Sequence, residues 1–118
     1  MSNPPSAAVH VEELSPGDLL EPGFFPRLNA AALAHEPCVY IVRNDGFARG
    51  VPLPLAFANP CLVDLAPAFR LRGARVHSEA ELAALLPRAR ALCARGHGPF
   101  WIEVLVASAP ENPPAEGD

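Results

Sequence analysis

The sequence has no lysine, and all nine of its basic residues are arginine. This absence excludes mechanisms that need a lysine nucleophile, a lysine Schiff base or the lysine of a phosphate-binding loop. Positive charge is scarce as well, because the formal net charge is -4 and no run of basic residues occurs. These features argue against a protein whose main partner is nucleic acid.

Long apolar runs are also missing. None reaches the ~20 residues that a membrane-spanning helix needs, and the first residues lack the basic start and apolar stretch of a signal peptide. We therefore expect no membrane partner and no export. The chain has 118 residues, of which 50% are hydrophobic and 19% are charged, and this is the size and composition of one globular domain.

Cysteine is present, but its pattern indicates neither a metal site nor a disulfide. Cys38, Cys61 and Cys93 are far apart in the sequence and none belongs to a CxxC pair. An odd count without an export signal predicts reduced thiols in the cytoplasm, and we interpret the three side chains as small buried apolar groups. The histidines are also scattered, which favours surface positions for all of them: His10, His35, His77 and His97.

The two ends of the chain differ in composition from the middle. Residues 1–7 are rich in Pro and Ser, and residues 108–118 combine Pro with three acidic residues and no base. Both compositions predict disordered termini, and the second is an acidic Pro-rich tail. The folded domain is then expected over residues 8–107.

Between these ends, four short apolar segments predict strands. They cover residues 8–14, 38–42, 74–77 and 100–106. The second and the fourth are near-continuous runs of β-branched and aromatic side chains, which is typical of strands buried on both faces of a parallel sheet.

The clearest helical pattern begins at Ser78, where Glu81 completes a capping box. Gly96 can end this helix in a left-handed conformation, and Pro87 should kink it. The apolar residues of the segment recur at intervals of three and four, which places them on one helical face: Leu82, Leu85, Leu86, Ala89, Leu92 and Cys93.

Two further helices complete an alternation of strands and helices. One covers residues 25–35, and the other begins at Asn59 with Pro60 at its first helical position. The alternation predicts an α/β fold of three layers, with a mainly parallel sheet of about four strands, flanking helices and right-handed crossovers. The connection formed by residues 43–58 is long, and a long loop after the carboxyl end of a strand in such a fold is often functional.

A series of short motifs in this order adds a resemblance to a known family. Gly17-Asp18 is followed by Leu28-Asn29-Ala30-Ala31, by the apolar strand of residues 39–42 and by Arg43-Asn44-Asp45-Gly46-Phe47-Ala48. Residues 65–76 then resemble the family's alanine-rich helix followed by Gly-x-x-Val-Asp, and residues 89–103 resemble its Ala-Arg-x-Gly-x-Gly-Pro-x-Leu-Ile-Glu segment. The series resembles the C-terminal half of the thiamine-diphosphate-binding domain of 2-oxo acid dehydrogenase alpha subunits, so the fold would be part of that domain.

This resemblance implies thiamine diphosphate as the cofactor, held through Mg²⁺. The cofactor-binding residues that it implies are Gly17, Asp18, Asn44 and Gly46. The implied metal ligands are Asp18, Asp45 and the backbone carbonyl of Phe47. Mg²⁺ prefers oxygen ligands in octahedral geometry, which carboxylates, a carbonyl and a diphosphate can supply. No residue of the chain corresponds to a catalytic group, so we assign none.

Two positions depart from the family's pattern. Leu19 stands where the pattern has Gly, which would place a side chain in the path of the phosphate. Asp45 stands where the pattern has Asn, which adds a negative charge beside an anionic cofactor. We therefore expect that the chain alone neither binds the cofactor usefully nor turns over a 2-oxo acid.

Two classes of function remain open. The first is a short or split alpha-like component that joins a related enzyme subunit, as a homo- or hetero-oligomer, for the oxidative decarboxylation of a 2-oxo acid. The second is a non-catalytic relative that serves as a scaffold or an interaction module.

Two charged residues near the motifs keep two interpretations each. Arg43 could meet a phosphate or could simply keep the following loop soluble. Glu103 matches a Glu of the family's last strand, and an acid near a strand end can also face solvent. The partners of each side chain distinguish the interpretations.

Overall fold

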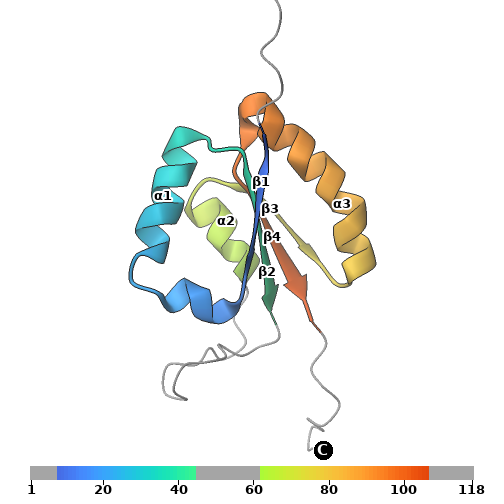
Figure 1. The fold of residues 1–118 in the computed structure, drawn as a ribbon. Helices are drawn as coiled ribbons and strands as arrows, with labels where there is room; N and C mark the ends of the chain where they lie inside the picture. The colour runs from blue at the N-terminus through green and yellow to red at the C-terminus, as the bar shows by residue number, and fades with distance from the viewer. Residues whose placement is uncertain (1–7, 45–61, 107–118) are drawn as a thin grey trace, which may run out of the picture.

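The computed structural model describes residues 8–44 and 62–106, and it confirms the predicted α/β architecture (Figure 1). The four strands are β1 (His10–Leu14), β2 (Cys38–Asn44), β3 (Arg72–Val76) and β4 (Phe100–Leu105). They lie in the order β1-β2-β4-β3, and every neighbouring pair is parallel. The segments predicted to be disordered termini, and the helix start at Asn59, lie outside the described residues.

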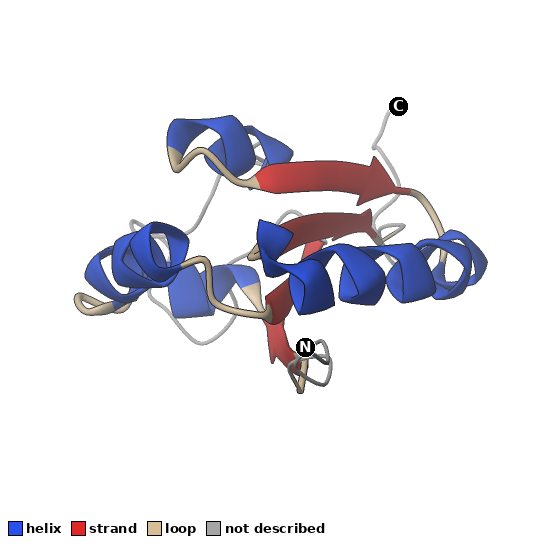
Figure 2. Ribbon diagram, turned by 90° about the horizontal axis from the view of Figure 1, so that it is seen from above, coloured by secondary structure: helices blue, strands red, loops and turns tan. Residues whose placement is uncertain are grey.

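Helices cover both faces of the sheet, which gives three layers (Figures 1 and 2). The helices are α1 (Phe24–Ala34), the short α2 (Leu65–Ala68) and α3 (Glu79–Leu92). Helices α1 and α2 lie on one face, called the α1 face below, and α3 lies on the opposite face. The chain moves from β1 through β2 to β3 with its helices on the α1 face, and it returns from β3 to β4 through α3. Crossovers of one hand arrange helices in this way.

Within residues 8–44 and 62–106, three single turns also lie between these elements. They are the 3-10 turns η1 (Pro16–Leu20) and η3 (Leu62–Asp64), and the π-helical turn η4 (Cys93–His97). Turn η1 follows β1, η3 precedes α2, and η4 continues α3 toward β4. Because β1 and β2 end beside each other, η1 lies at the same edge of the sheet as the end of β2.

Local hydrogen bonds explain where α3 begins. The Ser78 hydroxyl accepts a hydrogen bond from the Glu81 backbone N–H at 3.1 Å, and the Glu81 carboxylate accepts one from the His77 backbone N–H at 2.7 Å. The predicted apolar face of α3 packs on the sheet. The helix continues through Pro87, and Gly96 has a φ of 89°, the left-handed conformation that the sequence predicted for its end.

Two apolar clusters fill the spaces between the layers. On the α1 face, the Trp101 ring is fully buried with its centroid 6.3 Å from that of Phe24 and 5.8 Å from that of Tyr40. The indole Nε1 also donates to the Leu62 carbonyl at 3.0 Å, which ties η3 to β4. The second cluster joins β2 and β4 to α3. Since both central strands are buried on both faces, their near-continuous apolar sequences are explained.

The predicted states of the thiols and histidines agree with the described residues. Cys38 and Cys93 are buried free thiols, and burial raises the pKa of Cys38 to about 11. Cys61 lies outside the described residues. All of the histidines are exposed. In the part of the chain that the structure describes, no helix is long and apolar enough to cross a membrane.

Candidate functional site at the carboxyl edge of the sheet

The carboxyl edge of the sheet gathers the described residues of the cofactor motif. Strand β1 ends at Leu14, and Gly17 and Asp18 follow within η1. Asn44 is the last residue of β2. Because β1 and β2 are parallel neighbours, these two motif segments lie at one edge, where ligands bind in open α/β sheets. The other predicted residues, Asp45, Gly46 and Phe47, lie outside the described residues.

The Asp18 carboxylate caps the turn in which it lies. Its Oδ2 accepts a hydrogen bond from the Ser15 backbone N–H at 2.8 Å, and Pro16 occupies the first position of η1. Asp18 also lines a hollow of about 470 Å³ between β1 and α1. Within residues 8–44 and 62–106, no three His, Cys, Asp or Glu side chains are arranged to hold a metal ion.

Leu19 differs from the expectation drawn from the sequence. Its side chain is only 3% exposed and belongs to the apolar cluster on the α1 face, together with Leu14 and Val42. It therefore fills the core instead of projecting from the carboxyl edge. The obstacle to phosphate that we expected from this side chain is not found there.

Glu103 is a fully buried carboxylate inside β4. Its Oε1 accepts hydrogen bonds from the Val63 backbone N–H at 2.8 Å and from Arg75 Nε at 3.1 Å. Its Oε2 accepts one from Asn44 Nδ2 at 2.7 Å. The donors come from η3, β3 and β2, so one carboxylate connects three elements. A carboxylate that is shielded from water needs hydrogen-bond donors of this kind to compensate for its lost hydration.

The register of the sheet explains why these side chains meet. Glu103 lies between Val42 of β2 and Arg75 of β3. Alternate side chains of a strand point to the same face, so Asn44, two residues after Val42, shares the α1 face with Glu103. The structure thus decides against a solvent-facing Glu103. The sequence held a signal for this, because an acid within a run of apolar strand residues is expected to be paired.

Arg43 is bound by carboxylates. Its Nε and Nη2 donate to the two carboxylate oxygens of Glu79 at 2.8 and 2.9 Å, and its Nη1 donates to Glu13. The hydrogen bond with Glu79 is the main cause that raises the pKa of Arg43 above its usual range. The side chain therefore links β1 and β2 to the start of α3, rather than waiting for a phosphate or only solubilising a loop.

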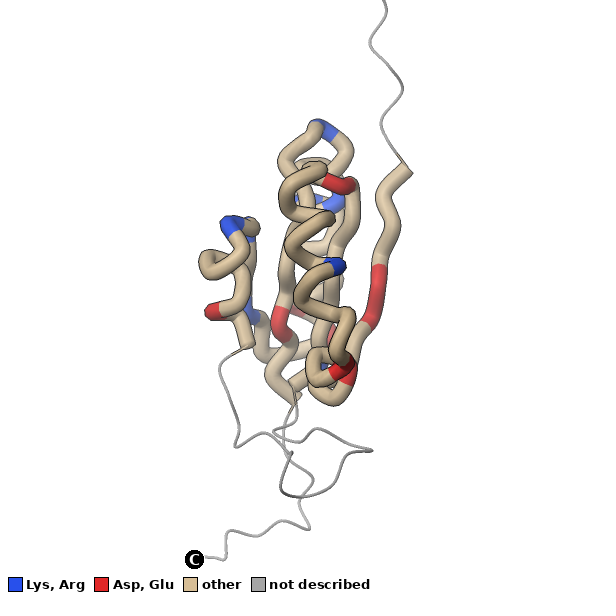
Figure 3. The backbone as a smooth tube through the Cα atoms, turned by 90° about the vertical axis from the view of Figure 1, so that its left-hand side faces the viewer, with Lys and Arg blue, Asp and Glu red and all other residues tan. Residues whose placement is uncertain are grey.

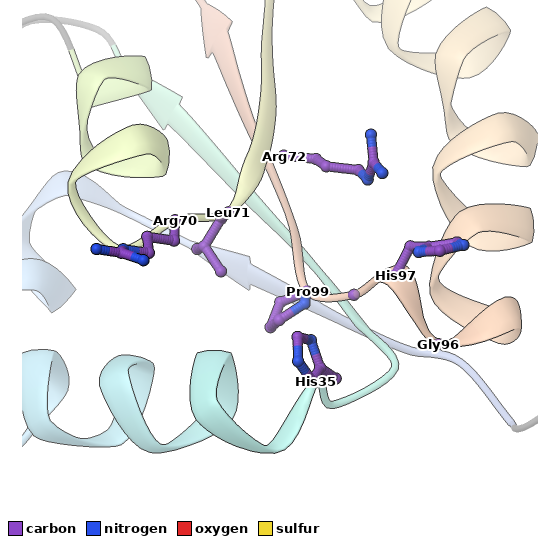
Figure 4. A pocket seen from close by; sticks show the side chains of 8 residues that line it. His35, Arg70, Leu71, Arg72, Gly96, His97 and Pro99 are labelled. Atoms are coloured by element: carbon purple, nitrogen blue, oxygen red, sulfur yellow. The ribbon is translucent and has the colours of Figure 1, made fainter.

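A second hollow, of about 280 Å³, opens at the amino edge of the sheet (Figure 4). Its described lining includes no acid and has basic residues on three segments of the chain: His35, Arg70 with Arg72, and His97. In Figure 4 Arg70 points to one side of β3 and Arg72 to the other, so their charges do not converge.

Helix ends explain the basic groups of this second hollow. His35 and Arg70 have φ values of 52° and 61°, and they follow α1 and α2 in the left-handed conformation that ends a helix. Gly96 does the same after α3. The Arg70 cation offsets the partial negative charge at the carboxyl end of α2. We therefore assign the candidate site to the carboxyl edge.

The fold and the site define a parallel three-layer α/β unit with polar residues at the carboxyl ends of its strands. No family model matches the chain. It is 32% identical over 100 residues to 3-methyl-2-oxobutanoate dehydrogenase subunit alpha of Mycobacterium tuberculosis, in strains CDC 1551 / Oshkosh and ATCC 25618 / H37Rv. The match covers 83% of this chain and 27% of the length of those relatives. The chain is thus similar to part of a 2-oxo acid dehydrogenase alpha subunit.

Proposed function

We propose that the chain is a short or split alpha-like component of a thiamine-diphosphate-dependent 2-oxo acid dehydrogenase, and that it needs a partner chain for oxidative decarboxylation. One observation carries the proposal, namely the 32% identity over 100 residues to the alpha subunit of a 2-oxo acid dehydrogenase. The position of Asp18 and Asn44 at one edge of a parallel sheet supports it.

The described residues fit a supporting role toward Mg²⁺ and the cofactor. Asp18 uses Oδ2 to cap η1, and its Oδ1 can serve as a metal ligand beside Asp45 and the Phe47 carbonyl. Glu103 holds Asn44 at the end of β2. Thiamine diphosphate, when bound, supplies the chemistry of carbanion stabilisation, and this chain orients it.

The partner belongs to the proposal for two reasons. The relatives are much longer, since the chain spans 27% of their length. The sequence also contains no residue that corresponds to the catalytic group of the family. A partner chain, such as a related beta subunit, would supply the remaining contacts to the cofactor and the catalytic group.

Titration calorimetry tests the proposal. Mg²⁺ and thiamine diphosphate are added to the chain alone and to the chain mixed with a purified 2-oxo acid dehydrogenase beta subunit. We expect magnesium-dependent binding in the mixture only. Asp18→Asn keeps the acceptor for the Ser15 N–H but removes the charge, so it should abolish that binding, whereas Glu21→Gln in the same hollow should not.

Three results would count against the proposal. Binding that is absent from the mixture, or that Asp18→Asn leaves unchanged, would remove the cofactor role. Tight binding by the chain alone would keep the cofactor role and remove the need for a partner.

The second candidate is a non-catalytic relative that serves as a scaffold or interaction module. A specific observation favours it, because both described polar motif side chains already stabilise the fold. Asp18 binds the Ser15 N–H and Asn44 binds Glu103. Association with the beta subunit without any heat of cofactor binding would support this candidate.

A further inference from the structure

Strand β1 is the outermost strand on one side of the sheet. The long side of β1 that faces away from β2 is open in the described part of the chain. Within residues 8–44 and 62–106, β1 pairs with β2 only. The His10 backbone N–H donates to the Pro37 carbonyl at 2.9 Å, so the backbone groups of His10 face β2. Because successive residues alternate, those of Glu12 also face β2, and those of Val11 and Glu13 point outward. Two amides are therefore available to a further strand.

The space beside β1 is incompletely filled on both faces. On the α1 face, β1 lines two hollows of about 470 and 420 Å³ that share the Glu12–Arg27 ion pair as a wall. On the opposite face, α3 packs on β2, β3 and β4, and Val9 and Val11 remain half-buried. An added strand would pair with the open backbone and would cover these side chains.

The larger of the two hollows is acidic. Its charged lining residues are Glu12, Glu13, Asp18 and Glu21, with Arg27 as the base. Glu12 is paired with Arg27 and Glu13 with Arg43, so within the described residues Asp18 and Glu21 are the acids of this hollow without an arginine partner. In Figure 3 acidic positions lie along β1 on one side of the sheet, whereas the segment on the other side carries both basic and acidic positions. Charge complementarity therefore requires a basic side chain in whatever segment adds to β1.

We propose that the open edge of β1 is a strand-addition site for an extended segment of another chain, with apolar side chains at alternate positions and a Lys or Arg that reaches the acidic hollow. The site lies beside the proposed cofactor residues but does not depend on cofactor binding. The relatives, of which this chain spans 27%, contain further polypeptide that could form such a segment.

A second copy of the chain is the poorer occupant. Pairing β1 with β1 of another copy would bring the acids Glu12 and Glu13 of both copies together, and like charges on facing strands are destabilising. Pairing β1 with β3 would join two different edges, which does not close into a dimer. The proposal therefore commits to a different chain.

The test follows the backbone amide resonances of the full chain while a short peptide is added. In the peptide, Val and Thr alternate and an Arg stands at each end. We expect saturable shifts at the amides of Val11 and Glu13, and binding about tenfold weaker for the same peptide with Glu in place of each Arg.

Two variants of one residue separate the backbone from the side chain. Glu13→Pro removes an outward N–H and leaves the backbone pairing with β2 intact, but it also removes the carboxylate that Arg43 binds. It should weaken peptide binding about tenfold, the effect of one lost hydrogen bond, and Glu13→Gln measures the contribution of the carboxylate separately. Glu13→Gln keeps the N–H and should weaken binding less. If Glu13→Pro lowers the thermal midpoint of the chain, the variant is set aside. The test then rests on the difference in affinity of the wild-type chain for the Arg-ended and the Glu-ended peptides.

Three outcomes would overturn the proposal. The first is the absence of shifts at β1 with every peptide, and the second is shifts at β3 instead. The third is a concentration-dependent shift of the Val11 and Glu13 amides without peptide, together with a dimer in sedimentation, which would assign the edge to a second copy.

Discussion

At the scale of single residues, the Glu103 carboxylate is the group that connects the elements of the carboxyl edge. It accepts a hydrogen bond from Asn44, at the end of β2, and another from Val63, in the turn that leads to α2. Arg75 of β3 adds a charged partner. One side chain thus sets the relative positions of β2, η3 and β3 on the α1 face.

Replacing Glu103 by Leu should destabilise the fold strongly. The variant removes the acceptor of three hydrogen bonds, one of them from the partly exposed Arg75, and the loss of an acceptor for buried donors typically costs about 1–3 kcal/mol. Urea unfolding at neutral pH measures this loss of free energy. The exposed Glu21→Gln serves as the control and should stay within about 0.5 kcal/mol of the wild type.

An exchange variant separates this network from a general effect of mutation. Asn44→Asp combined with Glu103→Gln keeps the total charge, the size of both side chains and a bond between carboxylate and amide. It should recover part of the stability that Glu103→Leu loses. A loss below about 1 kcal/mol for Glu103→Leu would show that the network contributes no more than an ordinary hydrogen bond.

At the scale of elements, the close approach of the turn before β4 to the end of α1 leaves no room for a side chain. A Cβ at Gly98 would lie 2.3 Å from the Glu36 carbonyl oxygen and 3.2 Å from Cys93 Sγ. Because the nearest atom belongs to the backbone, Gly98→Ala should destabilise the fold by about 1–3 kcal/mol.

Gly23→Ala is the matched control for Gly98→Ala. No atom lies within 4 Å of a Cβ at Gly23, so its unfolding free energy should change by only about 0.5 kcal/mol. Thermal unfolding of both variants measures the difference. Equal losses would mean that the contact between Gly98 and Glu36 is not tight in solution.

The Glu12–Arg27 ion pair, which joins β1 to α1, should make stability depend on pH. The hydrogen bonds from Arg27 lower the pKa of Glu12 below its ordinary value of 4.5. A carboxyl group with a lowered pKa stabilises the folded state above its ordinary value, and this contribution is lost as the pH falls through the lowered pKa.

Glu12→Gln should therefore be less stable than the wild type at neutral pH and should lose less stability below pH 4.5. Urea midpoints over a pH series measure both effects. Arg27→Gln should give the same pattern, since it removes the partner. Parallel curves for the wild type and Glu12→Gln would show that the pair contributes nothing, as many exposed pairs do.

The elements that the sequence predicted correctly carry their signals locally. The capping residues Ser78 and Glu81 lie in one turn, and the runs of β2 and β4 are continuous in sequence. The network of Glu103 depends on the register among three strands, which no local pattern encodes. The structural role of Asp18 does have a local signal, since Ser15 and Asp18 stand three residues apart at the start of a turn, but this spacing coincides with the cofactor motif.

At the scale of the whole molecule, the helix dipoles have opposite signs at the two ends of the parallel sheet, the carboxyl edge and the amino edge. Helices α1 and α3 run opposite to the strands that they connect, so their amino ends lie at the carboxyl edge and their carboxyl ends at the amino edge. Helix amino ends favour anions, and helix carboxyl ends disfavour them. This polarity opposes an anion site in the hollow at the amino edge, whereas at the carboxyl edge the acids Glu12, Asp18 and Glu21 offset it.

The basic residues of the amino edge should accordingly stabilise helix ends without binding anions. Arg70→Gln should lower stability by about 0.3–1 kcal/mol, because it removes a cation from the end of α2. Arg88→Gln, inside α3, is the control and should have a smaller effect.

Inorganic phosphate raises the thermal midpoint of many proteins because it is excluded from their surface, so the decisive quantity is the difference in this rise between the wild type and Arg72→Gln. We expect an equal rise in both. A rise that Arg72→Gln or Arg70→Gln abolishes would establish an anion site at this edge and would contradict the polarity argument.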